Sequence, residues 1–306
     1  MQIIQQVKKQ LLFNRDQLSY FHNLSEQNYQ RSQQQHLNNI PTISDEEKAI
    51  VNQLQQQGIV ITSLADLGIP LTPQVLTDAT AIIPHIAKVL PSYKNQYLVK
   101  ASSELLLRYP SLFRWGAELK LLNLVENYLR LPVAYHGVYF RRDLANNVKK
   151  KTRLWHLDKE DRKMLKVIIY LSDVCEESGS FQYISKDLTP WIFDKLKYNY
   201  SQIAEEAMEA IISSYYWKSC IGKSGTVIII DPASIFHRGK VPVKSERFSL
   251  FFDYTSRIPK YPYFCKSCCG IDELVKLSQS LSKTVKNCIF WNFKLQQEYY
   301  QKQRFI

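Results

Sequence analysis

The sequence predicts a mainly β core, folded as a double-sheet sandwich or barrel and flanked by helices. Between residues 132 and 258, short runs rich in β-branched and aromatic residues alternate with turn signals, a pattern typical of such folds. Before residue 131 and after about residue 271, apolar residues recur at helical spacing. The 306 residues, 45% of them hydrophobic, suffice for one large domain or two small ones. We expect a single domain over residues 1–306: a helical flanking region at 1–131, the β core at 132–258 and a helical tail at 259–306.

Helices are expected throughout the flanking region. The first is predicted to run to about residue 30, followed by a loop or a frayed helix end at residues 33–35. Ser44 and Glu47 have the spacing of a capping box, so another helix should begin there. Apolar periodicity predicts two further helices, at residues 73–90 and 102–130.

Six segments of the central region are expected to be strands. They are short, rich in Val, Ile, Thr, Phe and Tyr, and bounded by turn residues. One helix, at about residues 201–214, is expected to interrupt them. The predicted strands span residues 136–141, 152–156, 166–171, 180–184, 226–230 and 247–254.

Composition limits the classes of partner. Lys and Arg exceed Asp and Glu by 12, and a basic surface attracts anions. The basic residues are scattered and form no stripe with stacking aromatics, so we interpret them as solubilising charge and expect no nucleic-acid partner. No segment approaches the roughly 18 apolar residues that span a bilayer, and the start lacks a secretory signal. We expect a cytoplasmic protein whose six cysteines are free thiols.

Three residues are candidate metal ligands. In a strand, His156 and Asp158 would share a face, with Cα atoms roughly 7 Å apart, so that both side chains can reach one metal ion. His237 follows the apolar run 226–230 and a turn at Pro232, and it is the candidate third ligand. Two histidines and a carboxylate form the facial triad of non-haem Fe(II) oxygenases, which leaves positions for a chelating 2-oxo acid and dioxygen. A structural zinc site would instead close four positions.

Arg247 is the candidate binding residue for the distal carboxylate of such a 2-oxo acid. It lies ten residues after His237 and begins a predicted strand, and a guanidinium can bind a carboxylate through two hydrogen bonds. Ser249, two residues further on the same strand face, could add a hydroxyl. Taken singly, His237 would be interpreted as a structural histidine and Arg247 as a surface residue. Their order along the chain, each at or near a strand, favours the oxygenase interpretation.

Residues 135–257 resemble the phytanoyl-CoA dioxygenase family of Fe(II)/2-oxoglutarate oxygenases. Besides the triad, the resemblance rests on an apolar strand with an acidic turn, a Gly-containing hairpin, and the turn before the distal histidine. The sequence departs from the family after the hairpin, where Ser185-Lys186-Asp187-Leu188 replaces the usual Pro-Gly-Ser-His. The resembling segments are Ile168–Asp173, Glu177–Ile184 and Gly222–Val227.

The resemblance implies a double-stranded β-helix, a cupin-like jelly roll, with Fe(II) bound by His156, Asp158 and His237 and 2-oxoglutarate bound by Arg247. By position, Tyr139 and Ile168 would line the co-substrate pocket. It also implies a hydroxylase that uses dioxygen and releases succinate and CO2. Related halogenases carry a small residue where this chain has an intact carboxylate, although desaturation or ring closure could use the same ligands.

The substrate class stays open. A natural product or amino-acid-like small molecule, anionic if the basic surface lines the entrance, is the leading hypothesis. The alternatives are a substrate bound to a carrier protein or to CoA, and a non-catalytic jelly roll that binds metal for structure or sensing.

Several other residues have two interpretations. Cys265, Cys268 and Cys269 have a CxxC spacing but no second pair, so free thiols are favoured over zinc. His136 begins a core strand and could point into the site. Trp155 is expected to pack in the core on the face opposite the first ligand. Arg141, Arg142 and Arg257 are interpreted as exposed strand ends, with contact to an anionic substrate as the alternative.

Overall fold

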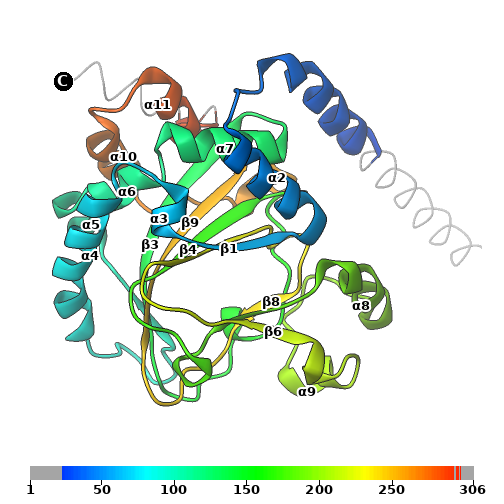
Figure 1. Ribbon diagram of the computed structural model, residues 1–306, viewed down its shortest axis with the longest axis vertical. Helices are drawn as coiled ribbons and strands as arrows, with labels where there is room; N and C mark the ends of the chain where they lie inside the picture. Colours follow the sequence, from blue (N-terminus) through cyan, green and yellow to red (C-terminus); the bar gives the residue numbers. More distant parts are fainter. Residues whose placement is uncertain (1–22, 293, 296, 298–306) are drawn as a thin grey trace, which may run out of the picture. The chain divides into compact units, whose positions relative to one another are not determined.

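Two antiparallel sheets form the core of the protein (Figure 1). The computed structural model describes residues 23–292, 294–295 and 297. The larger sheet has six strands in the order β1-β7-β4-β9-β3-β2, and the smaller has three in the order β6-β5-β8. The strands of the larger sheet are β1 (Ile59–Ser63), β7 (Thr226–Ile230), β4 (Leu165–Tyr170), β9 (Arg247–Ser256), β3 (Val133–Asp143) and β2 (Leu98–Lys100); those of the smaller are β6 (Trp217–Cys220), β5 (Phe181–Ile184) and β8 (His237–Gly239).

Five of the six predicted strands are present. The prediction at residues 152–156 is wrong, because a 3-10 turn occupies Lys151–Arg153 and only isolated bridges follow it. Lys151 has a φ of 51°, in the left-handed region, which ends any extended run. Trp155 bridges to Ile203, and His156 bridges to His237.

The chain separates into two compact units, Met1–Ile40 and Pro41–Ile306. In the first unit, residues 23–36 are helical, and a 3-10 turn follows at Leu37–Asn39. Of the two expectations for residues 33–35, the loop is therefore wrong, since glutamine has a high helix propensity. The part of the first predicted helix before residue 23 lies outside the described residues.

The helices of the second unit begin and end close to the predicted signals. Ser44 and Glu47 form the capping box of α2 (Asp45–Gln57), as expected. The helix predicted at residues 73–90 is α4 (Thr72–Ala87). The remaining helices are α3 (Leu64–Leu67), α5 (Ser103–Arg108), α6 (Ser111–Trp115), α7 (Leu119–Leu129), α8 (Thr189–Leu196), α9 (Glu205–Glu209), α10 (Ile271–Ser278) and α11 (Lys283–Ile289). Three helices, α5, α6 and α7, occupy the segment predicted as one helix at residues 102–130. Of the helix predicted at about residues 201–214, only the short helix α9 is present, and the unpredicted helix α8 precedes it.

The breaks between α5, α6 and α7 have local causes. Pro110 has no backbone N–H to continue α5. Gly116 ends α6 where the chain meets the sheet, and a Cβ there would lie 2.4 Å from both Phe252 and the Tyr135 hydroxyl. The Tyr254 hydroxyl donates to the Gly116 carbonyl at 2.7 Å. Close helix-to-sheet packing therefore decides where α6 stops.

The two faces of the larger sheet pack against different parts of the protein. Alternate residues of a strand point to opposite faces. On β9, Phe252 packs under Trp115 of α6, with ring centroids 4.8 Å apart. Its neighbour Phe251 points to the other face, into an apolar cluster with Ile168 of β4 and Phe181 of the smaller sheet. The outer face thus holds the helices, and the inner face meets the smaller sheet.

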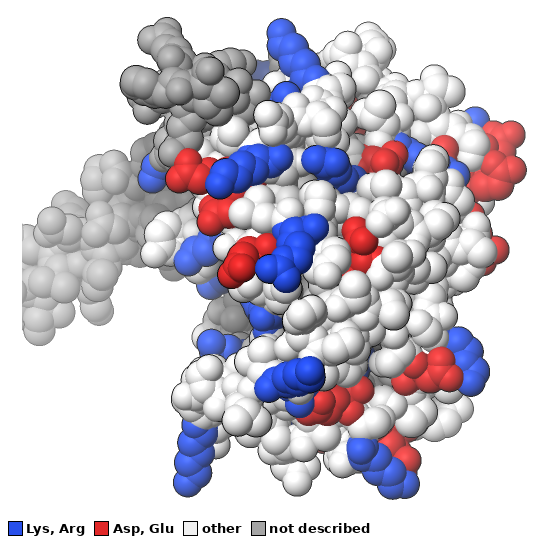
Figure 2. Space-filling model, turned by 90° about the vertical axis from the view of Figure 1, so that its left-hand side faces the viewer, with Lys and Arg blue, Asp and Glu red and all other residues white. Residues whose placement is uncertain are grey.

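The surface charge is mixed on the face that Figure 2 shows, which includes α4 and α5. Lys, Arg, Asp and Glu side chains are interspersed there and form no continuous basic stripe. Arg108 and Glu104 of α5, for example, lie 3.8 Å apart. Among the described helices, none is long and apolar enough to span a membrane.

One buried carboxylate fixes the turn between β7 and β8. Asp231 accepts hydrogen bonds from the Tyr128 hydroxyl at 2.6 Å and from the backbone N–H of Ala233 at 3.1 Å. The neighbouring Pro232 carbonyl accepts from the N–H of Asp158 at 2.9 Å. The α7 helix thereby positions both segments that carry the candidate metal ligands.

We predict that Tyr128→Phe lowers the free energy of unfolding by about 1.5–3 kcal/mol, because it removes a buried hydrogen bond to an acidic group. Urea denaturation would measure the loss. The control is Tyr215→Phe, which makes the same change at a side chain that is 86% exposed. Equal stability of the two variants would contradict the structural role of the Tyr128–Asp231 contact.

Candidate metal centre

The structure brings the three candidate ligands together. His156 and His237 face each other as a backbone pair, and each N–H donates to the other's carbonyl at 3.1 Å. The ligand atoms of His156, Asp158 and His237 all lie within 4.8 Å of one another. Within the described residues, this is the only group of three or more His, Cys, Asp or Glu side chains with that geometry.

Both imidazoles are oriented by their own backbone. Nδ1 of His156 donates to the Leu154 carbonyl at 2.8 Å, and Nδ1 of His237 donates to the Ile235 carbonyl at 3.0 Å. With the proton on Nδ1, the Nε2 lone pair of each ring is available to a metal. Nε2 of His156 and of His237 lie 3.4 and 3.8 Å from Oδ1 of Asp158. Three donor atoms therefore converge on one point.

The protonation states also suit a metal. Burial alone would raise the pKa of Asp158, but Lys166 and the two histidines hold it well below its usual range. Burial, with a smaller contribution from His156, lowers the pKa of His237 to about 3. At neutral pH the carboxylate is ionised and the His237 imidazole is neutral, which are the metal-binding forms.

Lys166 of β4 is a member of this centre that the sequence did not reveal. Its Nζ lies 2.7 Å from Oδ2 of Asp158 and 3.7 Å from Oδ1 of Asp253. The two oxygens of Asp158 thus have separate partners, since Oδ1 faces the histidines and Oδ2 is held by the ammonium. This arrangement leaves one carboxylate oxygen for a metal ion.

The donor set fits Fe(II). Two imidazole nitrogens and one carboxylate oxygen on one side of an ion form the facial arrangement of non-haem iron sites. A structural zinc ion would need a fourth protein ligand. The thiols do not provide one, because Cys268 and Cys269 contact each other at 3.5 Å, away from the triad.

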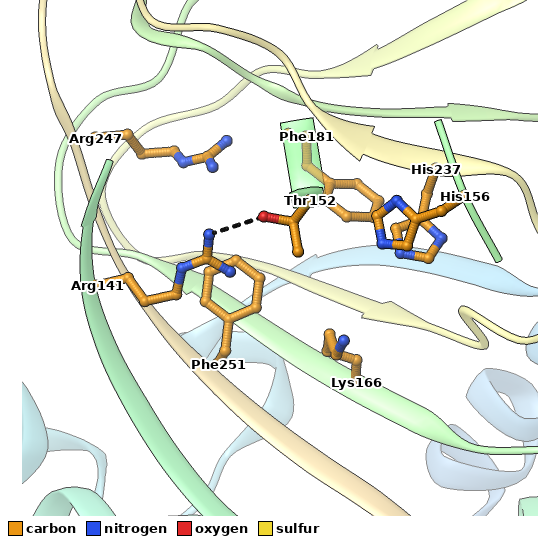
Figure 3. A pocket seen from close by; sticks show the side chains of 9 residues that line it. Arg141, Thr152, His156, Lys166, Phe181, His237, Arg247 and Phe251 are labelled. Atoms are coloured by element: carbon orange, nitrogen blue, oxygen red, sulfur yellow. Dashed lines mark hydrogen bonds between the residues drawn. The ribbon is translucent and has the colours of Figure 1, made fainter. Parts of the chain in front are cut away.

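A cavity opens beside the histidines (Figure 3). His156 and His237 lie at one end, and the guanidinium groups of Arg141 and Arg247 lie at the other. The full lining consists of Arg141, Thr152, His156, Lys166, Phe181, His237, Gly239, Arg247 and Phe251.

Arg247 reaches the cavity from the start of β9. Its side chain is 2% exposed, and Nη2 donates to Oδ2 of Asp143 at 3.0 Å, while Nη1 donates to the Gly179 carbonyl. A Cβ at Gly239 would lie 3.2 Å from Nη2, so glycine leaves room for the guanidinium. Burial lowers the pKa of Arg247, but Asp143 outweighs it and the net pKa is raised.

The other predicted pocket residues lie near the cavity but are not part of its lining. Tyr139 and Ile168 pair with Phe251 from its two sides in the sheet register. The Tyr139 hydroxyl donates to the Lys266 carbonyl at 3.3 Å. Ser249 is fully buried on β9, and its hydroxyl has no hydrogen-bond partner within the described chain.

The interpretation of Arg141 as an exposed strand end is wrong. Its side chain is 12% exposed and lies in the cavity. The next residue, Arg142, is also largely buried, because it points to the opposite face and pairs with Glu246 at 2.6 Å. Strand alternation could have placed Arg141 on the same face as Tyr139, had the strand been registered against β9.

His136 and Trp155 do not contribute to the cavity lining. His136 is buried, with Nε2 2.8 Å from the Thr255 hydroxyl and its ring edge-on to Trp291. Trp155 is fully buried, as expected, and packs against Trp217 and the guanidinium of Arg238.

No protein-family model matches the sequence, and no curated protein matches it. Several solved structures are similar to this chain. The apo form of EctD from S. alaskensis is 15% identical over 74% of this chain and 84% of EctD, with a TM-score of 0.50. EctD with 2-oxoglutarate and 5-hydroxyectoine is 16% identical over 72% of this chain and 80% of EctD, also with a TM-score of 0.50. HygX from Streptomyces hygroscopicus, with nickel and 2-oxoglutarate bound, is 16% identical over 71% of this chain and 88% of HygX, with a TM-score of 0.45.

The likeness to EctD shows the fold. The chain has the double-stranded β-helix of EctD, with an antiparallel core and flanking helices, and the predicted fold class is confirmed. Its larger sheet is open, with β1 and β2 at the edges.

We predict that the protein binds one Mn(II), used as a redox-stable probe, and that Asp158→Asn weakens this binding by more than about 100-fold. Loss of outer-shell partners costs about 10–100-fold, and loss of a ligand should cost more. Titration calorimetry on the metal-free protein measures both affinities. The matched control, Glu160→Gln, makes the same chemical change two residues away. Equal weakening in the two variants would place the metal elsewhere.

Proposed function

We propose that this protein is an Fe(II)/2-oxoglutarate-dependent oxygenase that hydroxylates a C–H bond of a small molecule. One observation carries the proposal: the two histidines of the His-Asp-His group line one end of a single cavity, and buried arginines line the other. Such a cavity offers a metal-binding end and a carboxylate-binding end to one elongated dianion.

The metal end would hold Fe(II) through His156, Asp158 and His237. When bound, iron and 2-oxoglutarate supply an oxidation by dioxygen that turns a substrate C–H into C–OH and releases succinate and CO2. Because Asp158 retains its carboxylate, the site keeps three protein ligands, and we propose hydroxylation as the outcome.

The arginine end would hold the distal carboxylate of 2-oxoglutarate. Arg247 presents a buried guanidinium, and its Nε has no partner within the described chain. Phe181 and Phe251 form apolar walls between the two ends. Ion pairs are stronger where water is excluded, so these walls favour binding of a dianion and limit solvent at the reacting end.

The charge of the cavity suits an anion. Its lining has three cationic side chains, Arg141, Lys166 and Arg247. Asp158 and Asp253 are the acids beside Lys166, whereas Asp143 alone pairs with the two arginines, so that one positive charge remains at the arginine end. We propose a small-molecule substrate, with an anionic one favoured by the cationic lining. EctD, which has the same fold, was solved with 2-oxoglutarate and the small molecule 5-hydroxyectoine.

We predict that the purified protein, supplied with Fe(II), dioxygen and a pool of candidate small molecules, converts 2-oxoglutarate into succinate. Asp158→Ala should abolish this turnover because it removes a ligand, while Glu160→Gln should retain it. Succinate is measured by mass spectrometry, and the product should be heavier than the substrate by one oxygen atom. If the wild-type protein binds metal but forms no succinate with any pool, a non-catalytic metal-binding protein is the better description.

We also predict that Arg247→Leu raises the KM for 2-oxoglutarate by at least about tenfold, since a charge-assisted hydrogen bond contributes roughly 1.5–3 kcal/mol. Arg247→Lys should fall between wild type and Arg247→Leu, because lysine keeps the charge but cannot form the bidentate contact. Succinate formation at varied 2-oxoglutarate concentration gives the KM. An unchanged KM in both variants would remove Arg247 from the co-substrate site.

A further inference from the structure

We propose that Arg141 and Arg247 form a two-arginine clamp for the distal carboxylate of the co-substrate, and that Arg141 makes the cavity selective for dicarboxylic 2-oxo acids. The inference rests on the proposed function and adds a specificity-determining residue to it. It follows from the contacts of Arg141, a buried residue of the cavity lining.

Asp143 holds the two guanidinium groups side by side. In the sheet register, Asp143 of β3 lies directly opposite Arg247 of β9, and Arg141 is two residues earlier on the same face of β3. Oδ1 of Asp143 accepts from Nη2 of Arg141 at 3.1 Å, and Oδ2 accepts from Nη2 of Arg247 at 3.0 Å. Because the Asp143 side chain is 2% exposed, it has little freedom to move. Both arginines are therefore fixed relative to each other.

Other contacts hold Arg141 towards the cavity. Its Cζ lies 4.3 Å above the ring centroid of Phe251, and Nη2 is 3.5 Å from the Thr152 hydroxyl. Figure 3 shows the guanidinium groups of Arg141 and Arg247 at the same end of the cavity, opposite the imidazoles. The side chain is thus arranged before any ligand binds, which reduces the entropic cost of binding.

The clamp retains unused donors and uncompensated charge. Nε of Arg141 and Nε of Arg247 are both buried without a hydrogen-bond partner within the described chain. Asp143 provides one negative charge for two positive ones. Burial would raise the pKa of the Asp143 carboxyl, but Arg141 and Arg247, with a smaller contribution from a third cation, Arg153, lower it to about 2. A bound carboxylate would supply the missing acceptor and the missing negative charge.

Arg153 itself is not directed at the cavity. Its guanidinium donates to the backbone carbonyls of Tyr97 at 2.8 Å and Val148 at 3.1 Å, and it is not part of the cavity lining. Lys166 lies with the histidines and is paired with Asp158. Arg141 and Arg247 are therefore the cations at the far end of the lining.

The clamp has a consequence for selectivity. A 2-oxo acid that ends in a methyl group could occupy the metal end but would leave the clamp's charge uncompensated in a buried place. Binding of 2-oxoglutarate should therefore depend on Arg141, whereas binding of 2-oxopentanoate, which has the same chain length without the distal carboxylate, should not.

The test compares these two ligands by calorimetry on Mn(II)-loaded protein, with no turnover. In the wild type, 2-oxoglutarate should bind more tightly than 2-oxopentanoate. Arg141→Leu should weaken 2-oxoglutarate at least about tenfold, the size of one charge-assisted hydrogen bond, and leave 2-oxopentanoate unchanged. Arg141→Lys should restore part of the affinity. The matched control is Arg142→Leu on the opposite face of the same strand, which should bind both ligands as the wild type does.

Three results would overturn the clamp. The first is Arg141→Leu with wild-type affinity for 2-oxoglutarate. The second is equal weakening of both ligands in Arg141→Leu and Arg141→Lys, which would indicate a merely structural role. The third is a wild-type protein that binds Mn(II) but not 2-oxoglutarate; that result defeats the proposed function itself, and the clamp with it.

Discussion

The backbone pair between His156 and His237 is the contact on which the candidate site depends. Its two hydrogen bonds of 3.1 Å join segments about eighty residues apart, and each histidine then uses its own chain to orient its ring. The third ligand is tied to the same place, because the N–H of Asp158 donates to the Pro232 carbonyl. The three side chains are thus fixed by main-chain geometry, with the packing of α7 behind it through Tyr128 and Asp231.

The space between the two sheets is unusual because it holds several charged side chains. Burial of an ion is costly unless a partner and further hydrogen bonds compensate it. Here Asp143 pairs with both Arg247 and Arg141, which leaves one positive charge, and Asp158 and Asp253 pair with Lys166. An apolar interior of the same volume would be easier to stabilise. Charged side chains lie along the cavity from the histidines to the arginines, and a binding site for an anion requires such groups.

The strands of this protein can be predicted from its sequence better than the lining of the cavity can. The runs at 166–171, 226–230 and 247–254 are dense in β-branched and aromatic residues, so pattern alone identified them. The prediction of a strand at 152–156 is wrong because a 3-10 turn at Lys151–Arg153, with Lys151 in the left-handed region, replaces its first residues, and composition does not encode that turn. The interpretation of Arg141 as an exposed residue is wrong for another reason. Which face of a strand is buried depends on the register with its neighbours, and a bulge between Tyr135 and Gly137 shifts the register of β3. The triad could be predicted because two histidines and an aspartate in this order along the chain are typical of a metal site. The role of Lys166 could not, because it depends on the pairing of β4 with β9, which places the lysine opposite Asp253.

Lys166 also constrains how the centre can work. An ammonium beside a metal-binding carboxylate would ordinarily repel the metal ion, so its presence calls for a compensating role. Of the two carboxylate oxygens of Asp158, Lys166 contacts Oδ2. Its Nζ also lies 3.7 Å from Oδ1 of Asp253 on the neighbouring strand, so two acids share its charge. Held in this way, Asp158 offers a single oxygen, so that an iron ion held by His156, Asp158 and His237 would keep positions open for a chelating 2-oxo acid and dioxygen. By holding Oδ2, Lys166 would keep Asp158 from binding the ion through both oxygens. This would leave more positions for the co-substrate, at the cost of some metal affinity.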